Sequence, residues 1–189
     1  HCRRPQLTAP HMTRDELEHA IRAACDVAND NELIVIGSQA ILGQFPDAPA
    51  ALRQSMEVDV IPSKGDAVAD RIEGVLGELS LFHQTHGFYV HGVSFDTAIL
   101  PLGWKDRLID VRPDEARPWV GRCLGGYDLA ASKLAAFRDK DRDFVRVLIS
   151  TQLLTARTLA DRVQLLPLSA EEIERRVRWV EQTARDVDA

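Results

Sequence analysis

Two stretches decide the fold: Leu33-Ile34-Val35-Ile36-Gly37-Ser38-Gln39-Ala40-Ile41-Leu42 and, further along, Ser55-Met56-Glu57-Val58-Asp59-Val60-Ile61-Pro62. In the first, a buried apolar run is broken by Gly-Ser and the spacing then becomes helical, which predicts a strand, a tight turn and the start of a helix. In the second, Glu57 and Asp59 alternate with apolar residues. Side chains two apart on a strand point to the same face, about 6–7 Å from one another. We therefore expect the two carboxylates to leave one face side by side while the valines enter the core.

Glu57 and Asp59 are candidate metal ligands. Adjacent carboxylates repel each other, and nothing in strand packing requires the pair, whereas Mg²⁺ takes oxygen ligands and is usually held by one or two carboxylates plus substrate phosphates. The alternative is an exposed edge strand whose polar face is acidic. The apolar residues around Asp59 favour burial near a cleft, and with it a magnesium site.

Gly37 and Ser38 are candidate phosphate ligands. Glycine lets the backbone approach a ligand, the N–H groups that begin a helix point outward, and the serine hydroxyl adds a donor. A plain strand-to-helix turn capped by serine is the alternative. The acidic pair that follows favours the phosphate interpretation.

A Gly-Ser turn before an acidic-x-acidic strand is the signature of the nucleotidyltransferase fold, and a second anchor lies at Asp128-Leu129-Ala130-Ala131-Ser132-Lys133-Leu134-Ala135-Ala136-Phe137-Arg138-Asp139-Lys140-Asp141-Arg142-Asp143-Phe144. From about Leu33 to Ile149 the chain resembles small nucleotidyltransferase-like bacterial proteins related to the AbiEii-type toxins of toxin–antitoxin systems. The resemblance implies an α/β protein with a polymerase-β-like fold, in which flanking helices cover a small mixed sheet and a helical C-terminal region follows. It also implies Mg²⁺-dependent transfer of a nucleoside monophosphate from an NTP to an acceptor hydroxyl, with the tRNA 3′ end as the leading acceptor and an antitoxin as a partner.

The same resemblance assigns roles further along the chain. Lys133 would contact the triphosphate, and Asp143 would sit behind it as a positioning carboxylate. Asp96 is the candidate for a third metal-binding carboxylate, with a turn aspartate that bonds its own backbone as the alternative. Two positions depart from the pattern: Glu57 stands where the related toxins usually carry aspartate, and Arg146 where a further aspartate is often seen.

Those departures keep a second class of function open: an idle nucleotide- or partner-binding module that has the fold without the chemistry. Transfer onto a protein or a small molecule is a third possibility, which the net charge of −6 favours slightly. In isolation, the charged segment from Arg138 to Asp143 would be interpreted as a solvated helix surface with ion pairs.

Composition is that of an ordinary globular protein, with 189 residues, 45% hydrophobic and 28% charged. A pI near 5.5 argues against a protein that coats nucleic acid. Three widely spaced cysteines without a CxxC motif, and no apolar run of about 20 residues, predict a cytoplasmic protein with no membrane contact. We expect a flexible N-terminal lead over residues 1–12, a nucleotidyltransferase-like domain over 13–124 and a helical region over 125–189.

Periodicity and turn signals predict the remaining elements. Helices are expected from a capping box at Thr13 to Ala28, over Ala67–Leu81, without a break from Tyr127, over Thr151–Leu165 and over Ser169–Val187. Strands are expected over Phe88–Val93, over its hairpin partner Thr97–Leu100, and over Arg107–Arg112 as the final one. His83, His86 and His91 match no zinc-binding spacing and are expected to be scaffold or loop residues, although His91 could line a base pocket.

Overall fold

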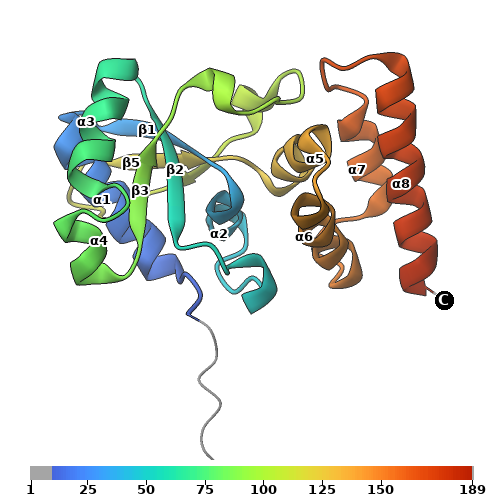
Figure 1. Ribbon diagram of the computed structural model, residues 1–189, viewed down its shortest axis with the longest axis horizontal. Coiled ribbons are helices and arrows are strands. Elements are labelled where there is room, and N and C mark those ends of the chain that lie inside the picture. The colour runs from blue at the N-terminus through green and yellow to red at the C-terminus, as the bar shows by residue number, and fades with distance from the viewer. Residues whose placement is uncertain (1–9, 189) are drawn as a thin grey trace, which may run out of the picture.

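Five strands form one mixed sheet in the computed structural model, which describes residues 10–188 (Figure 1). The strands are β1 (Glu32–Ile36), β2 (Glu57–Pro62), β3 (Tyr89–Gly92), β4 (Ile109–Val111) and β5 (Val120–Cys123). Their order across the sheet is β3-β2-β1-β5-β4. Strand β1 pairs antiparallel with β2 and parallel with β5, β2 pairs parallel with β3, and β4 pairs antiparallel with β5. The predicted α/β class is confirmed.

Helices flank the sheet and continue beyond it. The α-helices are α1 (Arg14–Ala28), α2 (Ile41–Gln44), α3 (Asp66–Leu76), α4 (Leu81–His86), α5 (Gly126–Ala136), α6 (Asp139–Ser150), α7 (Ala156–Val163) and α8 (Ala170–Asp188). Short 3₁₀-helices are η1 (Ser38–Ala40), η2 (Ala50–Leu52), η3 (Phe95–Thr97) and η4 (Trp104–Arg107). Figure 1 shows α5 to α8 grouped beside the sheet. We call residues 10–124 the sheet half and residues 125–188 the helical half.

The alternation on β2 separates the two faces of the sheet. Val58 and Val60 are fully buried and lie in register with Val90 and Gly92 of β3. Gly92 lies against α3, since a Cβ added there would come 2.1 Å from the carbonyl oxygen of Ala69. This face is therefore the one that α3 covers, and α1 packs against α3. The intervening residues of β2 and β3 point to the opposite face.

The N-terminal helix forms as its capping box predicts. Thr13 Oγ1 accepts a hydrogen bond from the Glu16 N–H, and the Glu16 carboxylate accepts one from the Thr13 N–H. Residues 1–9 of the expected flexible lead lie outside the described residues. Met12 belongs to the ordered structure, because its side chain is fully buried and its N–H donates to the carbonyl of Arg53.

Three predictions in the sheet half were wrong. The segment Ala67–Leu81 is not one helix, because α3 ends at Leu76 and α4 begins only at Leu81. The expected hairpin strand over Thr97–Leu100 is absent; the 3₁₀-helix η3 ends at Thr97, and no strand follows it in that segment. The strand at 107–112 is shorter than expected and is not the last, because β5 follows and lies between β1 and β4. A glycine and an arginine interrupt the apolar pattern of β5, which hides it in the sequence.

The helical segment after Tyr127 also differs from the prediction. Phe137 adopts a left-handed conformation with φ +57° and ends α5, so α5 and α6 are separate helices that pack on each other. A left-handed conformation is rare for a bulky residue. Here the centre of the Phe137 ring lies 4.9 Å from the guanidinium carbon of Arg142 and 4.9 Å from that of Arg176. The break turns α6 back so that its first turn meets α5.

The two halves are joined through a buried carboxylate. Asp128 on α5 is only 1% exposed, and its Oδ1 lies 2.8 Å from a guanidinium nitrogen of Arg107 in the sheet half. It also lies 2.8 Å from a guanidinium nitrogen of Arg162 on α7. Beside this group, the Gly126 N–H that begins α5 donates to Gln44 Oε1 at 2.7 Å. These contacts fix the position of α5 relative to the sheet.

Candidate active site

An open cleft of about 920 Å³ lies between the sheet half and the helical half. Its sheet side is lined by the turn after β1, the start of β2 and the segment 96–99. Its helical side is lined by one face of α5, by Arg138 and by residues of α6 between Lys140 and Val147. The residues predicted from the sequence to bind metal or phosphate, Gly37, Ser38, Glu57, Asp59, Asp96, Lys133 and Asp143, all contribute to this lining.

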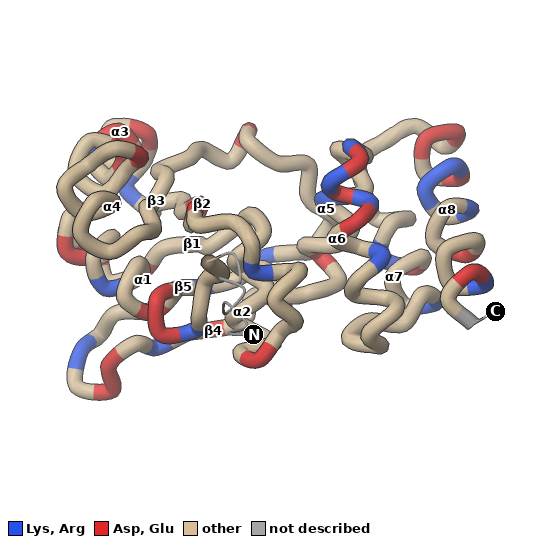
Figure 2. The backbone as a smooth tube through the Cα atoms, turned by 60° about the horizontal axis from the view of Figure 1, so that its bottom comes forward, with Lys and Arg blue, Asp and Glu red and all other residues tan. Residues whose placement is uncertain are grey.

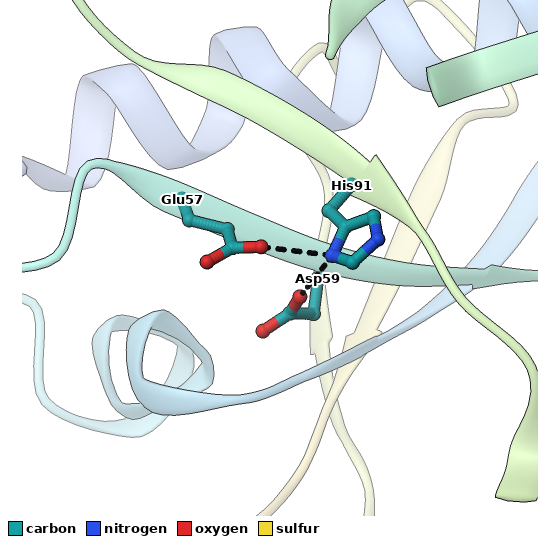
Figure 3. Close-up of side chains that lie close together, drawn as sticks. All are labelled: Glu57, Asp59 and His91. Carbon is teal, nitrogen blue, oxygen red and sulfur yellow. Dashed lines mark hydrogen bonds and ion pairs between the residues drawn. The ribbon is translucent and has the colours of Figure 1, made fainter. Parts of the chain in front are cut away.

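The acidic pair on β2 meets a histidine from β3 (Figure 3). His91 Nδ1 lies 2.8 Å from Glu57 Oε1 and 3.3 Å from Asp59 Oδ1. The parallel register that places Asp59 opposite His91 produces this contact. One potential ligand atom from each of the three side chains lies within 4.8 Å of the other two.

The pKa of Asp59 is raised to about 6, first by burial and then by the negative charge of Glu57, while His91 acts in the opposite direction. Burial and a neighbouring negative charge both disfavour the ionised form of a carboxylate, and a nearby positive charge favours it. A divalent cation supplies that charge, and two carboxylates are a ligand set that Mg²⁺ accepts. The side chains present therefore fit the metal that the sequence implied.

The turn after β1 approaches the acidic pair closely. Gly37 has φ +72° and ψ −176°, a conformation open almost only to glycine, and a Cβ added there would come 2.1 Å from Asp59 Oδ2. Ser38 begins η1, and α2 adds only four residues beyond it. A helix this short contributes little dipole, so the backbone N–H groups of the turn and the Ser38 hydroxyl are what the site offers to a phosphate.

Lys133 lies on the helical side of the cleft with its side chain 14% exposed. Its Nζ lies 3.5 Å from Asp141 Oδ1 and 4.7 Å from the centre of the Phe144 ring. Burial lowers the pKa of Lys133, and Asp141 opposes this shift. Burial alone would raise the pKa of Asp141, but the hydrogen bond from Arg138, at 2.6 Å, and the charge of Lys133 bring it below its ordinary value.

The structure therefore places Asp141, not Asp143, behind Lys133. Asp143 is exposed and forms an ion pair with Arg146. The sequence placed the lysine and the charged segment on one continuous helix; the break at Phe137 changes which carboxylate faces α5. Figure 2 shows the alternating basic and acidic residues at the start of α6.

Asp96 lines the cleft from η3 but does not belong to the close group around Asp59. The third member of that group among the described residues is His91, which sequence reasoning assigned to the scaffold. One signal for it existed: the strand containing His91, if paired in parallel beside β2, brings an imidazole next to Asp59. The parallel pairing of β2 with β3, which are separated in the chain by α3 and α4, cannot be predicted from a single sequence.

Carboxylates on a sheet that face a lysine and an arginine across a cleft are typical of enzymes that hold a phosphorylated substrate between a divalent cation and fixed basic groups. A family model described as "Nucleotidyltransferase of unknown function (DUF6036)" matches residues 15–183, and the chain belongs to this family. The mixed α/β sheet agrees with the nucleotidyltransferase-like fold predicted from the sequence.

No curated protein and no solved structure matches the chain significantly. Within residues 10–188, none of the helices combines the length and apolar character needed to cross a membrane.

Proposed function

We propose that this protein transfers a nucleoside monophosphate from an NTP to an acceptor hydroxyl with the help of Mg²⁺. The observation that carries the proposal is the opposition of charges across one cleft: the carboxylates of Glu57 and Asp59 on the sheet side, and Lys133 with Arg138 on the helical side. A triphosphate can bridge the two sides of the cleft, because its oxygens bind both a divalent cation and fixed basic groups.

Glu57 and Asp59 would hold the cation, which when bound neutralises phosphate charge and favours ionisation of the acceptor hydroxyl. Gly37 and Ser38 would orient the phosphates at the sheet side. Lys133, held by Asp141, would bind the leaving pyrophosphate portion. In the reaction the acceptor oxygen forms a bond to the α-phosphorus, the bond from that phosphorus to the β-phosphate oxygen breaks, and the hydroxyl proton leaves to solvent as pyrophosphate departs.

Asp96 and Asp143 keep peripheral roles in this proposal. Both line the cleft, and both are exposed. Asp96 stands on the same side of the cleft as the acidic pair but outside the close group of Glu57, Asp59 and His91. Asp143 would tune the charge at the cleft entrance through its ion pair with Arg146.

The proposed acceptor is the 3′ end of a tRNA, and the proposed biological role is that of a cytoplasmic toxin held in check by an antitoxin. Both proposals rest on the resemblance of the Gly-Ser turn, the acidic strand and the Lys133 region to AbiEii-type proteins. The exposed Arg138 and Lys140 at the cleft give a polyanionic acceptor a place to bind. A protein or small-molecule hydroxyl is the alternative acceptor.

The test is incorporation of each labelled NTP in turn, with Mg²⁺ and total RNA, by the wild-type protein and by Glu57→Gln and Asp59→Asn. We expect label in a tRNA-sized band and a loss of at least about 100-fold in both variants, the scale on which removal of a transition-state contact acts. Asp70→Asn, which alters an exposed carboxylate on α3 outside the cleft lining, is the matched control and should retain activity.

Label that enters protein instead of RNA would reject the tRNA acceptor and keep the transferase. Nucleotide binding with no transfer to RNA, protein or small molecules would favour the idle binding module, which the unusual Glu57 first suggested.

A further inference from the structure

We propose that His91 is the third ligand of the metal site and that, through it, the site prefers Mn²⁺ to Mg²⁺. The inference deepens the proposed function, since it concerns the same site, but it is tested by metal binding without nucleotide. It therefore stands or falls separately from the transfer reaction.

The distances carry the first step. Octahedral ligands at about 2.1 Å from a cation lie about 3 Å from their neighbours. His91 Nδ1 lies 2.8 Å from Glu57 Oε1 and 3.3 Å from Asp59 Oδ1, so the imidazole nitrogen already has the spacing of a ligand adjacent to both carboxylates, and one ligand atom from each side chain lies within 4.8 Å of the other two. Figure 3 shows the imidazole pointing at both carboxylates from the neighbouring strand.

The far side of the ring gives a second, independent observation. His91 Nε2 faces the carboxylate of Glu73 on α3, with Oε2 3.8 Å away. A histidine that binds metal almost always directs its other nitrogen to a carboxylate, a carbonyl or water, which fixes the tautomer and the ring orientation. Coordination through Nδ1 requires the ring hydrogen on Nε2, the side where Glu73 lies. At 3.8 Å the contact is an ion-pair distance and longer than a hydrogen bond, so in this proposal Glu73 would orient the ring through its charge, as a positioning residue.

The donor set bears on the choice between Mg²⁺ and Mn²⁺. Carboxylate and water ligands suit both ions, whereas imidazole suits transition ions such as Fe²⁺, Ni²⁺ and Zn²⁺ and does not suit Mg²⁺. Two carboxylates and one imidazole, with open positions for nucleotide oxygens and water, make a mixed site. Mn²⁺ accepts nitrogen more readily than Mg²⁺ and keeps the octahedral geometry that a triphosphate complex needs.

The experiment is a titration of the full chain with Mn²⁺, read from the electron paramagnetic resonance signal of the free ion, and a parallel calorimetric titration with Mg²⁺. For the wild type we expect one site that binds Mn²⁺ at least about tenfold more tightly than Mg²⁺. His91→Ala should weaken Mn²⁺ binding by at least about tenfold, and Glu73→Gln by a smaller factor. His83→Ala, a histidine on α4 outside the group, should change neither affinity.

Two further readouts separate ligation from a structural role. Pulsed resonance spectra of bound Mn²⁺ should show coupling to an imidazole nitrogen that disappears in His91→Ala. His91→Asp, which restores an all-carboxylate set, should keep metal binding while lowering the ratio of Mn²⁺ to Mg²⁺ affinity by about tenfold. If circular dichroism shows that His91→Ala does not fold, His91→Asp still tests the inference.

Unchanged or tighter Mn²⁺ binding by His91→Ala would overturn the inference. It would mean that His91 only forms hydrogen bonds with the two carboxylates and does not bind the metal. An unchanged affinity ratio in His91→Asp would overturn the metal preference. Nucleotide transfer with Mg²⁺ by a protein that does not bind Mn²⁺ would overturn this inference and leave the proposed function standing. The expected pattern of Mn²⁺ affinities, found in a protein that transfers no nucleotide, would support this inference and overturn the proposed function.

Discussion

Asp128 and Asp141 in the helical half each lie against two cationic side chains, whereas Glu57 and Asp59 in the sheet half share a single histidine. Asp128 contacts Arg107 and Arg162, and Asp141 contacts Lys133 and Arg138. All four carboxylates are partly or fully removed from water, yet only the sheet half leaves its charge uncompensated. The difference separates acids that form buried ion pairs within the fold from the acids that we propose bind a cation.

The largest effect should come from breaking the compensated side at Asp128. Asp128→Ala leaves two arginines facing a buried cavity, and removal of one partner of a buried ion pair costs about 3–5 kcal/mol. We expect a loss of that size in the free energy of unfolding, measured with urea. A loss below about 1 kcal/mol would mean that the arginines find other partners and that the comparison does not hold.

The next effect concerns the turn that approaches Asp59. Gly37→Ala forces an alanine into a glycine conformation, at about 1–3 kcal/mol, and places its Cβ on Asp59 Oδ2. Gly65→Ala is the matched control, because Gly65 has φ +90° but no atom within 4 Å of an added Cβ. We expect similar strain from both substitutions and a loss of metal affinity only in Gly37→Ala, measured by calorimetry. Equal metal affinities would contradict the close contact.

Substitution of Asp59 should change the free energy of unfolding in the opposite direction from substitution of Asp128. Because the pKa of Asp59 is raised in the folded state, that state binds this proton more tightly than the unfolded state does. Ionisation of Asp59 therefore destabilises the metal-free protein. This loss of stability develops as pH rises from about 4 to about 6 and is complete above that. Asp59→Asn should therefore stabilise the metal-free protein at pH 8 by about 1–2 kcal/mol, with the gain shrinking toward pH 4. Thermal unfolding in a chelating buffer measures this. If Asp59→Asn is less stable than the wild type at pH 8, the acidic pair of the sheet half is stabilising, as Asp128 is, and the difference between the two halves is contradicted.

The smallest effect is expected at Asp143. Its exposed ion pair with Arg146 should be worth less than about 0.5 kcal/mol, so Asp143→Ala should unfold almost as the wild type does. Asp141→Ala, two residues away, should lose at least about 2 kcal/mol because Lys133 and Arg138 lose a buried partner. Equal losses in urea titrations of the two variants would return Asp143 to the role predicted from the sequence.

Local patterns in the sequence predict the strand at Glu57, the turn at Gly37 and the capped helix from Thr13. Each of these is set by residues within a few positions of one another. Features that depend on partners distant in the sequence leave no such local pattern. Strand β5 is recognisable only once β1 and β4 are beside it. The left-handed Phe137 is held by arginines from α6 and α8.

The same limit explains the candidate site. Glu57 and Asp59 were identified because the two lie on one strand. Lys133 was identified through the family resemblance, and the structure places it across the cleft. His91 required the parallel pairing of β2 with β3, and Asp141 required the break between α5 and α6. In both cases the missing information was which segments pack together.

The position of β5 has a consequence for synthesis of the chain on the ribosome. Strand β1 can pair with β2 as soon as both have emerged, but its other edge stays open until Val120–Cys123 arrives. That edge belongs to an apolar strand, and an unpaired apolar strand edge invites intermolecular pairing. Between the emergence of β2 and of β5 the nascent chain therefore exposes an apolar strand edge, and shielding of this edge would disfavour aggregation in that interval.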